Sequence, residues 1–331
     1  MTPALQLEIL DLRHFSAASL RPLLEAESRL WSERLEWDYR ASADLLLQYL
    51  DSRVLPGYVA IENGRVAGYL FCVYEEHKAV IGDVFAIAPQ NSEATASDIE
   101  VRLLESLIEL LQNSPGVDRI ESQLLLHPHG MHASAFRSGG FDIYRRLFMR
   151  LDLTASPLVA GKPLPTDITM RPWHEDDFST AAHLISVAYQ GHLDSHINDQ
   201  YRSVPGSLRF LHNIVRFPGC GLFDNPASRV LVRTGTNEVV AILLCSRVRE
   251  DVAHITQLCV AKEERGRGLG RILIDNCAAH LASRKFRALT LTVTEANENA
   301  VALYRHAGFA VKHTFDAMLW ERRKLGVRKQ E

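Results

Sequence analysis

The sequence predicts an α/β (α+β) protein built from two similar halves. Its 331 residues are about twice the length of a typical single domain. A proline-rich connector lies near the middle of the chain, and strand and helix patterns follow one another in the same order on both sides of it. Apolar residues make up 47% and charged residues 23%, the balance of a globular protein with enough apolar material for two cores.

The connector spans residues 154–166 and carries three prolines and one glycine without an apolar period. This composition is typical of an extended linker, because proline fixes the backbone and removes a hydrogen-bond donor. We therefore expect one domain over residues 1–153 and a second domain over residues 167–325.

The second half alternates strand and helix signals. A glycine turn joins two apolar runs as in a β-hairpin, and a later strand leads through a glycine-rich loop into an amphipathic helix. We expect strands at 167–171, 229–233, 239–244, 253–260, 288–293 and 311–320, and helices around 183–185 and over 269–281 and 299–306. Residues 189–217 are interpreted as irregular.

The first half repeats this order with weaker signals. Its expected elements are strands at 58–61, 66–73, 84–89 and 120–126 and a helix at 99–111. The segment Phe136–Phe141 also mirrors Tyr304–Phe309, since both begin with an aromatic residue and Arg and end in Gly-Phe. We interpret the two halves as a tandem duplication.

Charge and composition argue against several classes of protein. The net charge of −3 does not suggest binding to nucleic acid, and no apolar run is long enough for a membrane span. The start of the sequence lacks the pattern of a signal peptide, so a cytoplasmic protein is expected. We expect it to be a monomer or a homodimer. No CxxC or HExxH spacing occurs, and no metal site is expected. Reduced, buried thiols are expected at Cys72, Cys220, Cys245, Cys259 and Cys277.

The chemistry-bearing segment is the loop Arg265–Gly270, which follows an apolar strand and precedes a helix. A helix N-terminus offers unpaired N–H groups and the positive end of the helix dipole. Glycines let a phosphate approach the backbone closely, and Arg265 and Arg267 add positive charge. The loop therefore predicts a binding site for a phosphate group.

A second motif, Asn297–Phe309, follows the glycine loop. Taken together, the two motifs resemble the GNAT superfamily of acyl-CoA-dependent N-acyltransferases. The pattern Arg-x-x-Gly-x-Gly is met by Arg265, Gly268 and Gly270, and the pattern Asn-x-x-Ala-x-x-Leu-Tyr-x-x-x-Gly-Phe is met in full. The resemblance implies tandem GNAT folds, each a mixed, mostly antiparallel twisted sheet flanked by helices. The layout, with an intact second half, also resembles that of mycothiol synthase.

The resemblance further implies acetyl-CoA as co-substrate and a role for each matching residue. Backbone groups of the strand before the loop, with Asn297, are expected to bind the pantetheine arm, and the loop amides to bind the pyrophosphate. The amide near Val260 is expected to polarise the thioester carbonyl, and Tyr304 to protonate the departing thiolate. The residues expected at the cofactor are Leu258, Cys259, Val260, Arg265, Gly266, Arg267, Gly268, Leu269, Gly270, Asn297 and Tyr304.

The general base is left open by the sequence. Members that acetylate protein N-termini of the ribosomal alanine type carry a Glu after the strand residue equivalent to Leu291, and this chain has Thr292 there. The remaining candidates are His254, Glu250, Asp251 or a water chain ordered by Thr256 and Gln257. For His254 the alternative is an exposed histidine at a strand end.

The acceptor is expected to meet the loop 192–202, which holds two His, two Asp, an Arg and a Tyr. The alternatives are a solvated loop and a metal site built from His192 and His196. In the first half, residues 90–98 contain no glycine and no Arg, and Phe136 replaces the tyrosine. We therefore expect that half to be a degenerate GNAT-like domain that no longer binds acetyl-CoA.

The function expected from these features is transfer of an acetyl group from acetyl-CoA to a primary amine of a small molecule or peptide. Two alternatives are a protein N-terminal or lysine acetyltransferase and a non-catalytic acyl-CoA sensor. A sensor does not need an acid for the leaving thiolate, so Asn297 and Tyr304 together favour an enzyme.

Overall fold

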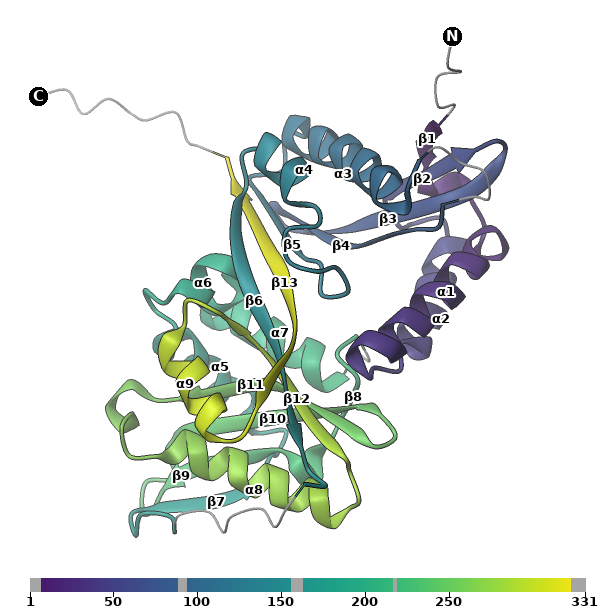
Figure 1. Ribbon diagram of the computed structural model, residues 1–331. Coiled ribbons are helices and arrows are strands. Elements are labelled where there is room, and N and C mark those ends of the chain that lie inside the picture. The colour runs from purple at the N-terminus through teal and green to yellow at the C-terminus, as the bar shows by residue number, and fades with distance from the viewer. Residues whose placement is uncertain (1–6, 89–93, 156–162, 217–218, 323–331) are drawn as a thin grey trace, which may run out of the picture. The chain divides into compact units, whose positions relative to one another are not determined.

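A computed structural model describes residues 7–88, 94–155, 163–216 and 219–322 (Figure 1). The described chain divides into two compact units. The N-terminal unit comprises residues 7–27, 43–144 and 315–322, and the C-terminal unit comprises residues 28–42 and 145–314. Each unit has its own mixed, mostly antiparallel sheet, as the sequence predicts.

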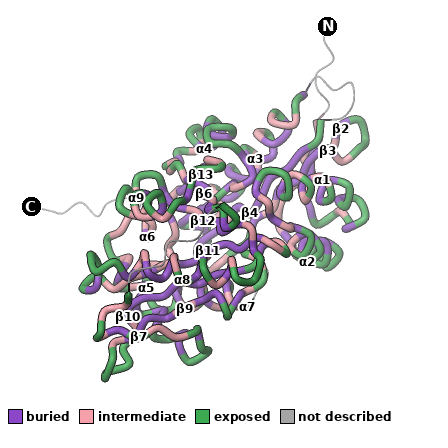
Figure 2. The backbone as a smooth tube through the Cα atoms, turned by 60° about the horizontal axis from the view of Figure 1, so that its bottom comes forward, coloured by how far each residue is buried: buried purple, intermediate pink, exposed green. Residues whose placement is uncertain are grey.

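The sheet of the C-terminal unit has the strand order β6-β12-β11-β10-β9-β7. Neighbouring strands are antiparallel except for the parallel pair of β11 and β12. The strands are β6 (Asp142–Asp152), β7 (Ile168–Pro172), β9 (Arg229–Arg233), β10 (Val239–Arg249), β11 (Val252–Val260) and β12 (Ala288–Thr294), and the short β8 (Leu222–Phe223) pairs with β10. Strand β10 is almost continuously buried, as is the first half of β11, which explains their long apolar runs (Figure 2).

Helices cover both faces of this sheet. One core cluster joins the sheet to α8 (Leu269–Ser283) and α9 (Glu298–His306), and another joins it to α5 (Asp177–Ala188) and α7 (Val204–Arg216). The segment expected to be irregular in fact contains α7 and the short α6 (Leu193–Ile197). The prediction was wrong for α7 because Pro205 stands in its first turn, where proline is tolerated, and Leu211 and Ile214 bury one face.

The N-terminal unit has the strand order β1-β2-β3-β4-β5-β13. Its core lies between this sheet and α3 (Ala96–Asn113) with α4 (Ala133–Ser138). The strands are β1 (Leu7–Asp11), β2 (Gly57–Glu62), β3 (Arg65–Glu75), β4 (Lys78–Ala86), β5 (Arg119–Gln123) and the end of β13 (Ala310–Glu321). Helices α1 (Ala17–Leu35) and α2 (Arg40–Asp51) each begin in one unit and end in the other.

The two units repeat the same local arrangement. Four residue pairs join β4 to β5 in parallel, ending at Ile81 and Ser122, and four pairs join β11 to β12, ending at Ile255 and Leu291. Aromatic rings also pack edge to face at matching places, Phe136 on Phe141 and Tyr304 on Phe309. The repeated pattern in the sequence is therefore a repeated structure.

The boundaries between the two units differ from the expected division at the connector, as the strand pairing shows. Strand β6 ends the first half of the sequence but pairs with β12, and the end of β13 pairs with β5. Residues 28–42 also belong to the C-terminal unit, where the Asp38 amide donates to the Val248 carbonyl at 2.8 Å. Part of the expected linker 154–166, namely 156–162, lies outside the described residues.

Two expectations drawn from the composition concern the burial of the cysteines and membrane-spanning segments. Of the five cysteines, Cys72, Cys245, Cys259 and Cys277 are buried, whereas Cys220 is exposed, so burial was wrongly expected for that thiol. Within the described ranges, no helix combines the length and apolar character needed to cross a membrane.

Candidate functional site

Strands β11 and β12 diverge in the middle of the sheet of the C-terminal unit. Their parallel pairing ends at Ile255 and Leu291, while β11 continues to Val260. A register shift against β10 occurs at the same place, between Leu244 and Cys245. Such a bulge bends a strand and redirects its backbone groups. We call residues 256–260 the free edge of β11, because no described strand pairs with their β12 side.

The hydrogen bonds of β11 determine which amides face this free edge. The Ala261 amide donates to the Val240 carbonyl of β10 at 2.8 Å. Backbone groups alternate in direction along an antiparallel strand. The amide of Cys259 therefore points toward β10, and the amides of Leu258 and Val260 point away from it, toward the free edge. Two of the three expected pantetheine-binding residues thus offer backbone donors there.

The glycine loop has the conformation that anion binding needs. Gly266 and Gly268 have φ angles of +80° and +81°, which only glycine adopts without strain. Gly268 is the N-cap of α8 and provides no side chain to satisfy the first helical amides. At Gly270 an added Cβ would lie 3.8 Å from Val260, an ordinary contact, and 3.3 Å from Leu303, a tight one, so the start of α8 lies beside the end of β11 and packs closely on Leu303.

The two loop arginines are bound by neighbouring protein groups. Arg265 donates to the Ala188 carbonyl at 3.0 Å. Arg267 pairs with Asp167 at 2.6 Å and with Glu264, a carboxylate that is only 3% exposed and that also pairs with Arg233. These ion pairs brace the loop and offset part of its positive charge. The backbone amides of the loop are therefore its main candidates for anion binding, and Glu264 is a residue that sequence reasoning missed.

Asn297 and Tyr304 begin and line α9. Asn297 is the N-cap of the helix, with Oδ1 accepting from the Ala300 amide at 3.3 Å. Tyr304 is 8% exposed. Burial and, after it, the negative charge of Asp194 raise the pKa of Tyr304 well above its usual range, although Arg146 acts in the opposite direction. The hydroxyl therefore stays protonated at physiological pH and is available as a donor.

The acceptor loop brings a carboxylate to this same place. Asp194 accepts a hydrogen bond from the Thr294 hydroxyl at 2.5 Å and lies 3.4 Å from the Asn297 side-chain nitrogen. Its side chain is 14% exposed. Next to it, Tyr189 stacks on Tyr201 with ring centroids 4.6 Å apart, so the region is lined by aromatic faces as well as by polar groups.

The metal alternative for this loop finds no support in the geometry. His192 accepts at Nδ1 from the Asp194 amide at 3.1 Å, and the guanidinium of Arg202 lies 3.2 Å from His196 Nδ1. A cationic guanidinium beside a ring nitrogen opposes a metal ion there. Among the described residues, no potential metal-binding group includes either histidine.

The base candidates from the sequence lie in unsuitable places. His254 is 5% exposed, bonds to Thr290 at 2.9 Å, and has its pKa lowered to about 3 by burial and, after it, Arg146. The alternative of an exposed strand-end histidine was therefore wrong. Glu250 and Asp251 precede β11, at the opposite end from Val260, and Asp251 pairs with Arg287.

The other sequence candidates for the base are also engaged elsewhere. Thr256 donates to the Leu244 carbonyl at 3.2 Å, and Gln257 lies 3.4 Å from the Tyr189 hydroxyl. Asp194, by contrast, lies beside Thr294 and Asn297. The sequence flagged its loop, but only the fold brings it beside β12.

The corresponding edge in the N-terminal unit is occupied by the chain itself. The Ile87 amide donates to the Ala67 carbonyl, so the Ala86 amide points away from β3, as the Val260 amide points away from β10. That Ala86 amide donates to Glu100 at 3.1 Å, and His127 contacts the Val84 carbonyl at 2.8 Å. Of the segment 90–98, residues 90–93 lie outside the described residues, and Thr95 and Asp98 form a capping box on α3.

Comparisons with known proteins agree with this geometry. Residues 194–309 match the model of the acetyltransferase (GNAT) family. A GCN5-related N-acetyltransferase from Sphaerobacter thermophilus shares 16% identity over 96% of both chains, with a TM-score of 0.65. A tandem GNAT protein from the clavulanic acid biosynthesis pathway shares 15% identity over 97% of this chain and 100% of its own, with a TM-score of 0.61.

A GNAT-family acetyltransferase from Colwellia psychrerythraea shares 10% identity over 94% of this chain and 98% of its own, with a TM-score of 0.53. No curated protein matches the sequence. At these identities the solved structures show the fold alone, and the family model identifies the domain. Residues 194–309 therefore form a GNAT-family acetyltransferase domain, in a chain with the fold of tandem GNAT proteins.

Proposed function

We propose that this protein transfers an acetyl group from acetyl-CoA to a primary amine of a small molecule or peptide by direct attack. One observation carries the proposal: the free edge of β11 ends at Val260 beside the start of α8, and α9, which contacts the same turn of α8 through Leu303, follows Asn297 and carries Tyr304 within the electrostatic influence of Asp194. These elements offer backbone donors, an anion-binding helix end and a protonated hydroxyl, which suit a thioester attached to a diphosphate.

The residues present fit acyl-CoA in charge and in space. The amides of Leu258 and Val260 can pair with the amide groups of the pantetheine arm, as a further strand would. The amides from Gly266 to Gly270 can hold the pyrophosphate at the N-terminus of α8. Space beside Gly268 is open, since no atom lies within 4 Å of the position of an added Cβ.

Acyl transfer to an amine needs three groups, and this unit offers a candidate for each. The bound co-substrate supplies an activated acyl group as a thioester. The Val260 amide donates to the carbonyl oxygen, where negative charge develops as the amine nitrogen forms its bond to carbon. The Asp194 carboxylate takes the proton that the amine loses. Tyr304 donates a hydrogen bond to sulfur as the carbon–sulfur bond breaks, and the thiolate takes up the proton that the amine released, giving an amide and a free thiol.

The surroundings of Asp194 favour a small cationic acceptor. Stacked Tyr189 and Tyr201 border the carboxylate's loop, and the side chains of Ser195 and Ile197 are buried there. A carboxylate beside aromatic faces attracts an ammonium group. A single amine or the end of a peptide fits such surroundings more readily than a lysine on a folded protein surface.

The test is thiol release from acetyl-CoA with a panel of acceptors that includes a polyamine, an amino sugar and a dipeptide. The expected result is release that depends on one class of amine and is lost in Gly268→Glu. Mass spectrometry of the product should show one added acetyl group on nitrogen. Binding of acetyl-CoA without transfer to any acceptor would contradict the proposal and favour the sensor.

A further inference from the structure

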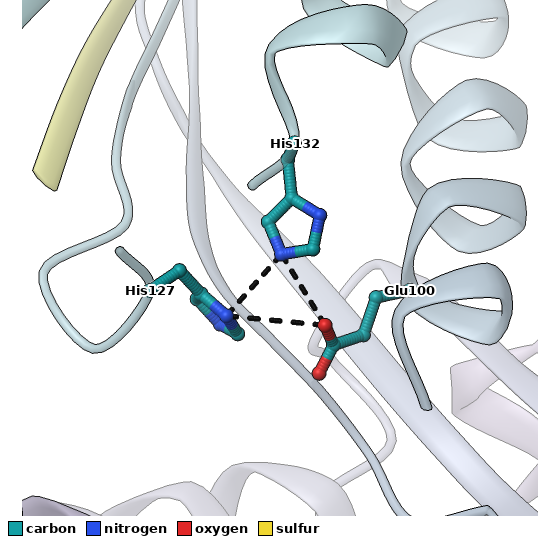
Figure 3. Close-up of side chains that lie close together, drawn as sticks. All are labelled: Glu100, His127 and His132. Carbon is teal, nitrogen blue, oxygen red and sulfur yellow. Dashed lines mark hydrogen bonds and ion pairs between the residues drawn. The ribbon is translucent and has the colours of Figure 1, made fainter. Parts of the chain in front are cut away.

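Three side chains that can bind a metal meet at the β4 edge of the N-terminal unit. Glu100 comes from the first turns of α3, His127 from the segment after β5, and His132 from the residue before α4 (Figure 3). One ligand atom of each lies within 4.8 Å of the others. All three residues are at least nine-tenths buried, with exposures of 3%, 5% and 4%.

The spacing of the three ligand atoms fits a single small cation. His132 Nε2 lies 3.2 Å from both His127 Nδ1 and Glu100 Oε2, and the latter two atoms are 3.8 Å apart. A point equidistant from the three atoms lies about 2.0 Å from each, and zinc binds imidazole nitrogen and carboxylate oxygen at about 2.0–2.2 Å. The ion therefore fits without movement of the side chains.

Outer contacts orient two of the ligands toward this point. Glu100 holds the Ala86 amide with Oε1 at 3.1 Å, which leaves Oε2 turned to the histidines. His127 Nε2 lies 2.8 Å from the Val84 carbonyl, which can only accept a hydrogen bond. The proton of a neutral His127 is thus on Nε2, and the lone pair of Nδ1 faces the centre. Ligands of metal ions are characteristically oriented by such outer hydrogen bonds.

The polar atoms of this group are incompletely satisfied by protein. Glu100 Oε2 and His132 Nδ1 are buried and have no hydrogen-bond partner. A buried carboxylate without sufficient partners costs free energy, and a cation at the centre would compensate Oε2 directly. Beside the two histidines lies a cavity of about 10 Å³, bordered also by Asp316, which is about the space of one water molecule.

The segment that carries the histidines is held in place independently. Asp316 accepts from the Gly130 amide at 2.7 Å and contacts His129 Nδ1 at 2.5 Å. Neither residue belongs to the three-residue group. The position of His127 and His132 therefore does not depend on the metal alone, and the site is prepared for an ion.

We propose that Glu100, His127 and His132 form a binding site for a divalent transition metal, with Zn²⁺ as the best fit. Two imidazoles and one carboxylate are ligands that zinc accepts, with a water in the fourth position. The ion joins α3, the segment after β5 and the start of α4 across the edge that in the other unit is free. The sequence led us to expect no metal site, because a His-x-x-x-x-His pair with a distant Glu matches neither CxxC nor HExxH spacing.

The experiment uses the full chain after dialysis against a chelator. Zn²⁺ alone is titrated calorimetrically, and Co²⁺ is added as a spectroscopic probe of tetrahedral geometry. The expected result is one ion per chain and a raised melting temperature that the chelator reverses. Glu100→Gln and His132→Gln should each weaken binding at least 100-fold, whereas His77→Gln, which removes an exposed histidine of the same unit, should leave it unchanged.

Two results would overturn the proposal. One is a wild-type chain that takes up no Zn²⁺ and melts at the same temperature with and without the ion. The other is equal Zn²⁺ binding by the wild type and His132→Gln. If the variants fold poorly, the titration of the wild-type chain decides. Co²⁺ at the proposed site should give a tetrahedral spectrum, whereas Co²⁺ bound only to exposed histidines gives an octahedral one.

Discussion

Asp194 accepts a hydrogen bond from the hydroxyl of Thr294 at 2.5 Å, although 99 residues separate them in the chain. This bond fixes a loop carboxylate at the end of β12, beside Asn297. If Asp194 takes the proton of the attacking amine, Asp194→Asn should lower kcat by roughly 10²–10⁴-fold, since the amide keeps the shape but is not a base. Steady-state kinetics with the best acceptor would measure this.

The matched control for that variant is Asp176→Asn, in the same unit, whose side chain is 91% exposed. It should leave kcat and the acceptor KM unchanged. A purely structural role for Asp194 would lower the melting temperature while kcat per folded molecule stayed normal. That outcome would remove Asp194 from the reaction.

Gly268→Glu should abolish the increase in melting temperature that acetyl-CoA gives to the wild type. A glutamate there is strained at φ +81° and brings negative charge to the amides that would hold the pyrophosphate. Thermal unfolding with and without acetyl-CoA measures the effect. Gly64→Glu is the control, because Gly64 has a similar φ of +74° and an equally open Cβ position, but in the other unit. An unchanged ligand shift in Gly268→Glu would refute the assignment of the loop.

Isothermal titration calorimetry should give one acetyl-CoA per chain. In the N-terminal unit, Glu100 already takes the amide of Ala86, and His127 contacts the carbonyl of Val84. A pantetheine arm would have to displace both side chains. Two sites of similar affinity would contradict this prediction and show that acetyl-CoA displaces the two side chains. A changed affinity of the second site in Glu100→Gln would then place that site at this edge.

The sequence predicted many of the local elements and both motifs, but it did not predict β1, α1, α2, β6 or α7, nor the way in which the halves combine. The hairpin of β9 and β10, the loop before α8 and the helix from Asn297 were predicted because short-range patterns determine them. The pairing of β6 with β12 depends on contacts between distant segments, which no local pattern encodes. For the same reason the loop containing Asp194 could be named as an acceptor candidate, while its bond to Thr294 could not.

Residues 28–42 also join the C-terminal unit through contacts with distant segments, which no local pattern encodes. One of these residues, Glu36, leads to a prediction about stability in acid. Burial of Glu36 opposes its ionised form, but ion pairs with Lys312, Arg150 and Arg287 outweigh burial and lower the pKa of Glu36 to about 2. A carboxyl with a lowered pKa stabilises the fold at pH values above its unfolded pKa of 4.5. That contribution is lost as the pH falls from about 4.5 to about 2.

Glu36→Gln should therefore lower the free energy of unfolding at pH 7 by up to roughly 3 kcal/mol, and by less to the extent that solvent screens the ion pairs. The difference between variant and wild type should shrink as the pH falls toward 2, because the wild-type carboxyl is then also neutral. Urea unfolding at several pH values measures both. A difference that does not vary with pH would indicate that packing, rather than charge, accounts for the loss.

Tyr304→Phe separates a chemical role of the hydroxyl from a packing role of the ring. The ring packs against Phe309, and the equivalent ring in the N-terminal unit is Phe136, so a phenylalanine is compatible with this position. If the hydroxyl donates to the departing thiolate, kcat should fall by roughly 10²–10⁴-fold. Acetyl-CoA affinity and melting temperature should change little, because the lost hydrogen bond forms mainly in the transition state.

The raised pKa of Tyr304 sharpens this last test. The pKa of the Tyr304 phenol lies well above 10, whereas a free thiol has a pKa of about 8.5. Transfer of the phenol proton to the thiolate is therefore unfavourable in free energy. The donor therefore acts by position, holding the sulfur as charge develops, and the wild-type rate should not decline as the pH rises from 8 to 10. A decline with an apparent pKa in that range, absent from Tyr304→Phe, would mean that the hydroxyl ionises and that burial does not protect it. Near-normal kcat with clearly lower stability in the variant would instead assign Tyr304 to the core.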